Sequence, residues 1–177
     1  ACGAHASFVE DSEHFSIVEA PHIDTGETGP VERMNLPAEM KGPLRSLSAG
    51  NAFFVAVGRD GVVWSSGSSS NGKLGRPGDS RLATVAVPPM RSVTTGYQFC
   101  LAVSESGQLW GWGHNAGNQL TGRRNNPNPV RMVLPGDAIV IEARAASNGS
   151  FVLTSDGGMY VVGSNQSGAL GIGEIIR

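Results

Sequence analysis

The sequence is poor in charged, aromatic and cysteine residues, and it has no long apolar run. Charged residues make up 16% of 177 residues, and the formal net charge is −2. So small a net charge gives no general attraction to nucleic acid or to anionic lipid. The longest apolar run, Ala52–Val57, falls far short of the roughly 20 residues that cross a bilayer. We therefore expect no strong nucleic-acid binding and no membrane span.

The two cysteines, Cys2 and Cys100, have no spacing typical of a metal site. Cys100 falls within an apolar run, so we predict that it is a small buried side chain rather than half of a disulfide. Free thiols lean toward a reducing compartment, the cytoplasm or the nucleus.

Glycine, in contrast, is abundant, with 25 residues, and many of them recur in one phrase. The phrase is Asp or Ser, Gly, any residue, an apolar residue, Trp or Tyr, two further residues, and Gly. It occurs at residues 60–67, 106–113 and 156–163. Its first glycines, Gly61, Gly107 and Gly157, are 46 and then 50 residues apart. Recurrence at such a period indicates one supersecondary unit that is built repeatedly.

The surroundings of the phrase also repeat. An apolar run of strand length precedes each copy, at residues 53–57, 99–103 and 150–153. Its continuous apolar character predicts burial on both faces. The turn residues that follow tolerate positive φ and predict a hairpin. After the aromatic strand come a bend, at residues 72–75, 118–121 and 168–171, and a proline-rich apolar segment such as 129–135.

Short strands at this period predict an all-β fold of propeller blades, with residues 1–177 as one partial or open propeller. The clear units span about 46–91, 92–141 and 142–177, the last one truncated. Because Pro30–Pro37 resembles Pro129–Pro135, we expect a degenerate unit at about 1–45. Three or four blades alone would expose apolar faces and strand edges. We therefore expect the chain to be an excerpt of a longer propeller, or a partner to cover its ends.

The repeated pattern of apolar run, Asp-Gly-x-apolar-Trp-x-x-Gly, Gly-x-Leu-Gly and Pro-Val resembles the repeat of the regulator-of-chromosome-condensation family. The resemblance covers residues 50–177 well and the first 49 residues weakly. It implies a seven-bladed propeller, of which this chain holds four blades at most. Members include an exchange factor for a nuclear small GTPase, plant ultraviolet photoreceptors, bacterial β-lactamase inhibitors and scaffold proteins. The photoreceptors carry tryptophan where Asn51 and Tyr97 stand here, which disfavours that function.

No pattern in the sequence favours catalysis or a cofactor. Residues 111–117 look like a dinucleotide-binding loop, but the spacing is one residue too long and no helix is expected after them. His5 begins a predicted strand, and Glu10, Asp11, Glu13 and His14 fall at a predicted solvated hairpin tip, which favours no metal site. We predict a protein that is not an enzyme and that has no cofactor.

The sequence favours a non-enzymatic protein-interaction scaffold that presents loops on a propeller. The alternative is guanine-nucleotide exchange on a small GTPase, which would need a wedge loop that is not seen between these units. Trp64, Trp110 and Tyr160 repeat in register and predict packing between blades, whereas Trp112 does not repeat. The candidate partner-binding residues are Arg123, Arg124, Asn125, His114 and Trp112. A solvated loop without a partner is the competing interpretation of this segment.

Overall fold

The computed structural model describes residues 18–19, 32–40, 42–121, 125–165 and 168–173. The chain divides into two compact units, Ala1–Pro43 and Leu44–Arg177. In the first, β1 (Val18–Glu19) pairs antiparallel with β2 (Glu32–Arg33). The predicted buried strand at residues 3–9 and the bend at 26–29 lie outside the described residues. The degenerate first unit therefore stays a prediction.

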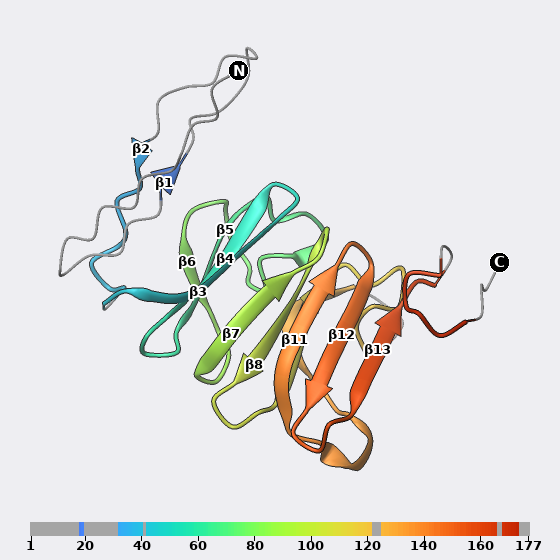
Figure 1. Ribbon diagram of the computed structural model, residues 1–177. Helices are drawn as coiled ribbons and strands as arrows, with labels where there is room; N and C mark the ends of the chain where they lie inside the picture. The colour runs from blue at the N-terminus through green and yellow to red at the C-terminus, as the bar shows by residue number, and fades with distance from the viewer. Residues whose placement is uncertain (1–17, 20–31, 41, 122–124, 166–167, 174–177) are drawn as a thin grey trace, which may run out of the picture. The chain divides into compact units, whose positions relative to one another are not determined.

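The second unit consists of three antiparallel sheets in which each strand pairs with the next along the chain (Figure 1). The first sheet contains β3 (Leu44–Gly50), β4 (Phe53–Gly58), β5 (Val63–Gly67) and β6 (Ala83–Val85). The second contains β7 (Met90–Thr95), β8 (Phe99–Ser104), β9 (Leu109–Gly113) and β10 (Asn126–Met132). The third contains β11 (Val140–Ala146), β12 (Gly149–Thr154) and β13 (Met159–Gly163). Two 3-10 turns, η1 (Ser70–Gly72) and η2 (Pro135–Asp137), are the described helical segments, so the prediction of an all-β fold is confirmed.

The repeated phrase forms the same structure in each sheet. The apolar runs become β4, β8 and β12, and the aromatic residues lie on β5, β9 and β13. The register is also the same, because Ala56 pairs with Trp64, Ala102 with Trp110, and Val152 with Tyr160. The predicted burial on both faces is confirmed for β8, whose six residues are all buried, and nearly so for β4.

The first strand of each sheet has no counterpart in the sequence prediction. β3, β7 and β11 mix serine, threonine, alanine and arginine with few large apolar residues, so no apolar run marks them. They lie side by side, and their hydroxyl groups link neighbouring sheets. Ser48 Oγ lies 2.9 Å from Thr95 Oγ1, and the Ala145 amide donates to Thr94 Oγ1 at 3.2 Å. These strands hold the three sheets together along one edge.

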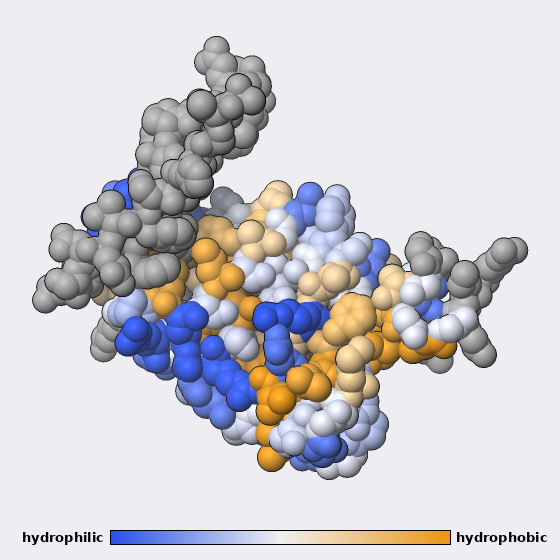
Figure 2. Space-filling view, in the orientation of Figure 1, coloured by the Kyte–Doolittle hydropathy of each residue, from blue (hydrophilic) through white to orange (hydrophobic). Residues whose placement is uncertain are grey.

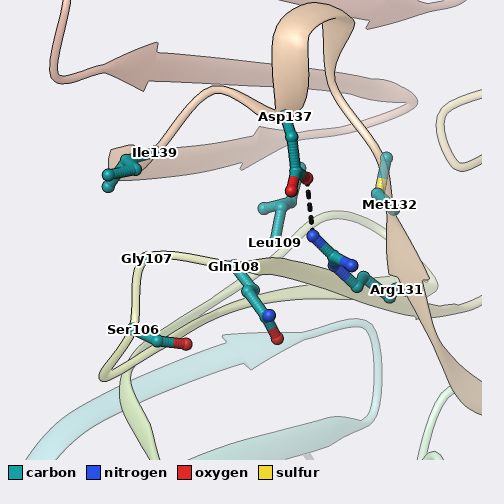
Figure 3. Close-up of a pocket in the computed structure, with 8 residues that line it drawn as sticks. All are labelled: Ser106, Gly107, Gln108, Leu109, Arg131, Met132, Asp137 and Ile139. Carbon is teal, nitrogen blue, oxygen red and sulfur yellow. Dashed lines mark hydrogen bonds and ion pairs between the residues drawn. The ribbon is translucent and has the colours of Figure 1, made fainter.

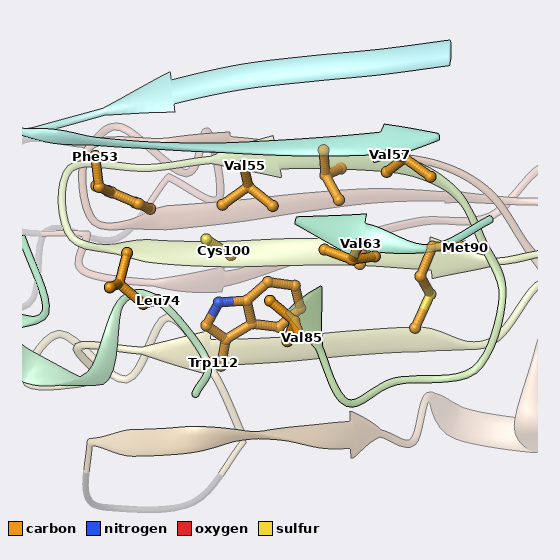
Figure 4. Packing of buried hydrophobic residues seen from close by; sticks show 11 residues of the cluster. Phe53, Val55, Val57, Val63, Leu74, Val85, Met90, Cys100 and Trp112 are labelled. Carbon is orange, nitrogen blue, oxygen red and sulfur yellow. The ribbon is translucent and has the colours of Figure 1, made fainter. Parts of the chain in front are cut away.

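The core lies between the sheets, in two clusters that repeat. In the first cluster, Val55, Val57 and Val63 of the first sheet pack against Cys100 and Trp112 of the second (Figure 4). In the second cluster, the equivalent residues of the second sheet pack against the third sheet; they are Leu101, Val103 and Leu109, opposite Val140, Ala143 and Val152. Each sheet therefore presents the same face to the next one.

The equivalent face of the third sheet is partly exposed to solvent. By the shared register, Leu153 and Met159 take the places of Val57 and Val63, which are fully buried. Leu153 is 37% exposed and Met159 is 68% exposed. Figure 2 shows apolar side chains over the β11–β13 region. This sheet has apolar residues at core positions without a following sheet among the described residues.

Cys100 is free and fully buried, as the sequence predicts, and burial raises the pKa of its thiol well above the usual value. Across the part of the chain that the structure describes, no helix has the length and apolar character needed to span a membrane.

Candidate interaction surface

The three sheets have two different ends. One end, here called the turn end, is formed by residues 51–52, 68–72, 97–98, 114–118 and 147–148, which are the turns after the first strands and the bends after the third strands. The other, here called the hairpin end, contains the tight turns at residues 59–62, 105–108 and 155–158, together with η2. Figure 1 shows the β7–β8 and β11–β12 turns at the upper edge and η2 at the lower edge.

Backbone hydrogen bonds join the turn end from sheet to sheet. The amide of Asn51 donates to the carbonyl of Tyr97, and the amide of Tyr97 donates to the carbonyl of Ser147, each at 3.0 Å. Within each sheet, the residue after the third strand donates to the same turn: Ser68 to Ala52 at 2.8 Å, His114 to Gln98 at 2.9 Å and Ser164 to Asn148 at 3.1 Å. The backbone of this end is therefore fixed, and the side chains at the tips are what it presents to solvent.

The prediction that Trp112 is a surface anchor is wrong. Its side chain is fully buried between the first two sheets, close to Leu74 and Val85 (Figure 4). The indole Nε1 donates to the carbonyl of Lys73 at 3.1 Å. The physical reason is its position on β9, where the side chain faces the first sheet. The bend after β5 leaves room for the ring at Gly75, where a Cβ would lie only 2.7 Å from the indole Nε1.

Two other predicted contact residues belong to one loop. His114 is half-buried, and its Nδ1 lies 3.4 Å from Nε2 of Gln119. Asn125 is exposed, and its Oδ1 accepts a hydrogen bond of 2.8 Å from the backbone amide of Asn115. Asn115 directly follows His114. Arg123 and Arg124 lie outside the described residues, so their role in partner binding stays a prediction.

Lys73 is a structural residue that sequence reasoning missed. It is 1% exposed, its Nζ donates to the Asn51 carbonyl at 2.8 Å, and it lies 5.4 Å from the Phe53 ring centroid. Burial lowers the pKa of the amine. Lysine in a glycine-rich bend is normally solvated, and nothing in the local sequence indicates that this one ties a bend to a turn.

Two hollows lie away from the turn tips. At the hairpin end, a pocket of about 120 Å³ is lined by Gln108, Leu109, Met132 and Ile139, with the ion pair of Arg131 and Asp137 (2.5 Å) at its side (Figure 3). Asp137 already neutralises the charge of Arg131, the arginine that lines this pocket. The pocket is therefore poorly suited to bind an anion.

A second hollow, of about 440 Å³, runs between β6 and β10 and includes Arg76. The guanidinium of Arg76 donates to the Oγ and the carbonyl of Ser65, each at 3.0 Å, and to the Asp79 carbonyl at 3.3 Å. Arg76 therefore shapes its own loop. Among the described residues, no group of three or more His, Cys, Asp or Glu side chains is placed to hold a metal ion, and the cluster at residues 5–14 lies outside them.

Residues 90–119, from the start of β7 into the bend after β9, match the regulator of chromosome condensation (RCC1) repeat. The chain carries a repeat of the RCC1 family. This confirms the family resemblance drawn from the glycine phrase. Comparison with curated protein sequences gives no match.

Solved structures of RCC1-type propellers are similar in fold to more than three quarters of this chain. Human WBSCR16 is 26% identical with a TM-score of 0.69, covering 77% of this chain and 36% of that one. Yeast RCC1 (Prp20), solved bound to Kap60, is 19% identical with a TM-score of 0.66, covering 77% and 33%. Prp20p from Saccharomyces cerevisiae is 20% identical with a TM-score of 0.60, covering 80% and 35%. The three sheets thus have the fold of RCC1-type propeller blades, and the chain spans about a third of each of these proteins.

Proposed function

We propose that the chain is a non-enzymatic protein-interaction scaffold that presents loops on propeller blades. The observation that carries this proposal is the turn end. Two equivalent backbone hydrogen bonds join the three equivalent tips, while the residues at these tips are Asn51, Tyr97 and Ser147. A fixed backbone with different side chains at equivalent places is what a recognition surface on a repeat protein requires.

The proposal includes the organisation of the domain. We propose that the described sheets belong to units at about 46–91, 92–141 and 142–177, with a degenerate unit at about 1–45. The bare apolar positions Leu153 and Met159 support a further blade, or a partner, against the third sheet. The related structures are a little more than twice as long as this chain, which supports a further blade.

The comparisons suggest which partners to test first. Prp20p is described as binding Gsp1p and histones, and yeast RCC1 (Prp20) as bound to Kap60. We propose that this chain also binds a folded protein, with a small GTPase as the first candidate. The test is biolayer interferometry of immobilised residues 1–177 against purified Gsp1p, Kap60 and core histones, with an unrelated protein of similar acidity on a reference sensor.

Saturable binding with a Kd of about 10 µM or tighter, at about 150 mM salt, is the expected result for at least one of these partners. Equal signals on the reference sensor, or none with any partner, would contradict the proposal for this group of partners.

Guanine-nucleotide exchange is the second candidate, because Gsp1p binding is a property of a protein with this fold. The assay is the release of fluorescent GDP from Gsp1p with and without the chain. The scaffold proposal expects the release rate to stay within about twofold of the intrinsic rate. An acceleration of about tenfold or more, which corresponds to roughly 1.4 kcal/mol of barrier, would favour exchange instead.

A further inference from the structure

Charge is distributed unequally between the two ends of the sheets. The hairpin end carries Arg59, Asp60, Glu105, Asp137 and Asp156. The residues of the turn end are asparagine, glutamine, serine, glycine, alanine, one tyrosine and His114, with no lysine, arginine, aspartate or glutamate. Lys73, which follows them, is buried. The described residues of the turn end therefore form a hydrogen-bonding surface without formal charge.

Charged residues do occur beside the turn end. Asp79 and Arg81 form an exposed ion pair of 3.5 Å. They flank Ser80, whose carbonyl accepts a hydrogen bond of 2.9 Å from the amide of Gly67, at the end of β5. An uncharged centre with a charged margin is the arrangement found in protein–protein interfaces, whose centres are depleted of charge and whose rims are polar.

Tyr97 is the large side chain that this end exposes. It is 54% exposed, although its backbone is held on both sides by hydrogen bonds to Asn51 and Ser147. Nearby, the Asn71 side chain donates to Oε1 of Gln98 at 2.7 Å. Rigid tyrosine together with serine, asparagine and glycine is the composition of antibody binding loops. Tyrosine supplies contact area at low entropic cost, and the small polar residues supply adaptable hydrogen bonds.

The backbone of the turn end is also unusual. Of the five described non-glycine residues with positive φ, four lie here: Ala52 at 58°, Asn71 at 59°, Asn118 at 55° and Ser147 at 45°. Alanine and serine rarely adopt this conformation, and such residues persist only where the surroundings hold them. Here the surroundings are the hydrogen bonds between turns. The end is therefore ordered before any partner arrives, which lowers the entropic cost of binding.

We propose that the turn end is the docking surface of the scaffold, with Tyr97 at its centre, and that its partner is a folded protein with an uncharged, hydrogen-bonding surface. This inference rests on the proposed function. Nucleic acid is disfavoured as the occupant, because its binding depends on lysine and arginine at the contact surface, and the turn tips that the structure describes expose neither. The contact forms without ion pairs at its centre, so its affinity changes little with salt.

Photocrosslinking locates the contact. Benzoylphenylalanine replaces Tyr97 at the turn end in one full-length variant and Ser106 at the hairpin end in another. Each is irradiated with purified Gsp1p, Kap60 or core histones. An adduct from position 97 and not from 106 supports the inference. An adduct from position 106 alone overturns it but leaves the scaffold function standing. Absence of both adducts and of binding overturns the proposed function and the inference together.

Kd measurements with the partner that crosslinking identifies test whether Tyr97 anchors the contact and whether the contact lacks ion pairs. Tyr97→Ala is expected to weaken binding by about tenfold or more, as for an interface anchor, whereas the matched exposed substitution Val133→Ala leaves it unchanged. The wild-type Kd is expected to change by less than about threefold between about 50 and 500 mM NaCl. A Kd for Tyr97→Ala within about twofold of wild type overturns the inference, as does a salt effect above about tenfold. Unchanged urea unfolding of Tyr97→Ala shows that the fold is intact.

Discussion

The indole of Trp112 lies where the first two sheets meet, and its contacts make it a stability residue. Its ring is fully buried in the first core cluster, and its Nε1 hydrogen-bonds the carbonyl of Lys73. The same carbonyl lies 3.5 Å from the Cys100 thiol. One bend of the first sheet is thus attached to two strands of the second.

Trp112→Ala is expected to destabilise the protein by about 3–5 kcal/mol, because it removes a large buried ring and leaves a cavity. Trp112→Phe keeps most of the apolar contact and loses the hydrogen bond, so a loss of about 1–2 kcal/mol is expected. Urea unfolding of the full chain measures both. Tyr97→Ala, at an exposed ring, is the control and is expected to stay within about 0.5 kcal/mol of wild type. A Trp112→Ala variant as stable as wild type would contradict the buried position.

The burial of some residues could be predicted from the sequence, and that of others could not. The packing of Trp110 and Tyr160 against the neighbouring sheet was predictable, because the same register recurs in each unit. Trp64 is buried, and its packing against another blade stays a prediction. The burial of Trp112 was not predictable, because it fills a space made by the first sheet, of which the local sequence carries no trace. The burial of Lys73 was not predictable, because its partners Asn51 and Phe53 lie about 20 residues earlier in the chain. Asn125 was singled out for its loop, and the structure gives it a local hydrogen bond to Asn115.

At the scale of elements, the last glycine of the repeated phrase fixes how each third strand leaves the sheet. Gly67, Gly113 and Gly163 have φ of 108°, 103° and 133°. A Cβ at these positions would lie 2.5, 2.6 and 2.3 Å from the carbonyl oxygens of Ala52, Gln98 and Asn148. Both the backbone conformation and the close approach to the neighbouring turn therefore require glycine.

Gly113→Ala is expected to destabilise the protein by clearly more than Gly157→Ala, as measured by urea unfolding. Gly157 has a φ of 85° but open space around its Cβ position, so its substitution carries the conformational strain alone, about 1–2 kcal/mol. Gly113→Ala adds a clash with the backbone of Gln98 and Phe99. Equal losses for the two variants would show that the close approach costs nothing.

The strands differ in how well the sequence predicts them. The second and third strands and their hairpins were predictable, because apolar runs and turn glycines mark them. The first strands were not, because residues such as Ser48 and Thr95 stabilise them through hydroxyl bonds to neighbouring sheets rather than through apolar burial. In a sequence, serine and threonine residues that form hydrogen bonds between sheets cannot be told from those that are solvated.

At the scale of the whole molecule, each sheet is covered on one face by the next, and the third sheet breaks the series. The propeller blades were predictable from short strands that recur at a fixed period, since a unit that recurs must stack on its own copies. The position of the proposed docking surface was not, because it depends on which turns the stacking brings together. Stacking places Asn51, Tyr97 and Ser147 in one hydrogen-bonded row, although they are distant in the sequence.

The apolar face of the third sheet makes a prediction for residues 1–177 expressed alone. Leu153 and Met159 are exposed at positions where Val57 and Val63 are buried by the next sheet, so the chain is expected to self-associate as concentration rises. Sedimentation velocity measures this, and the double substitution Leu153→Lys, Met159→Lys is expected to shift the chain toward monomer. Val133→Lys, at an exposed apolar residue after β10, is the matched control and is expected to leave association unchanged. A wild-type chain that stays monomeric up to about 100 µM, or a control that disperses it equally, would mean that this face does not drive assembly.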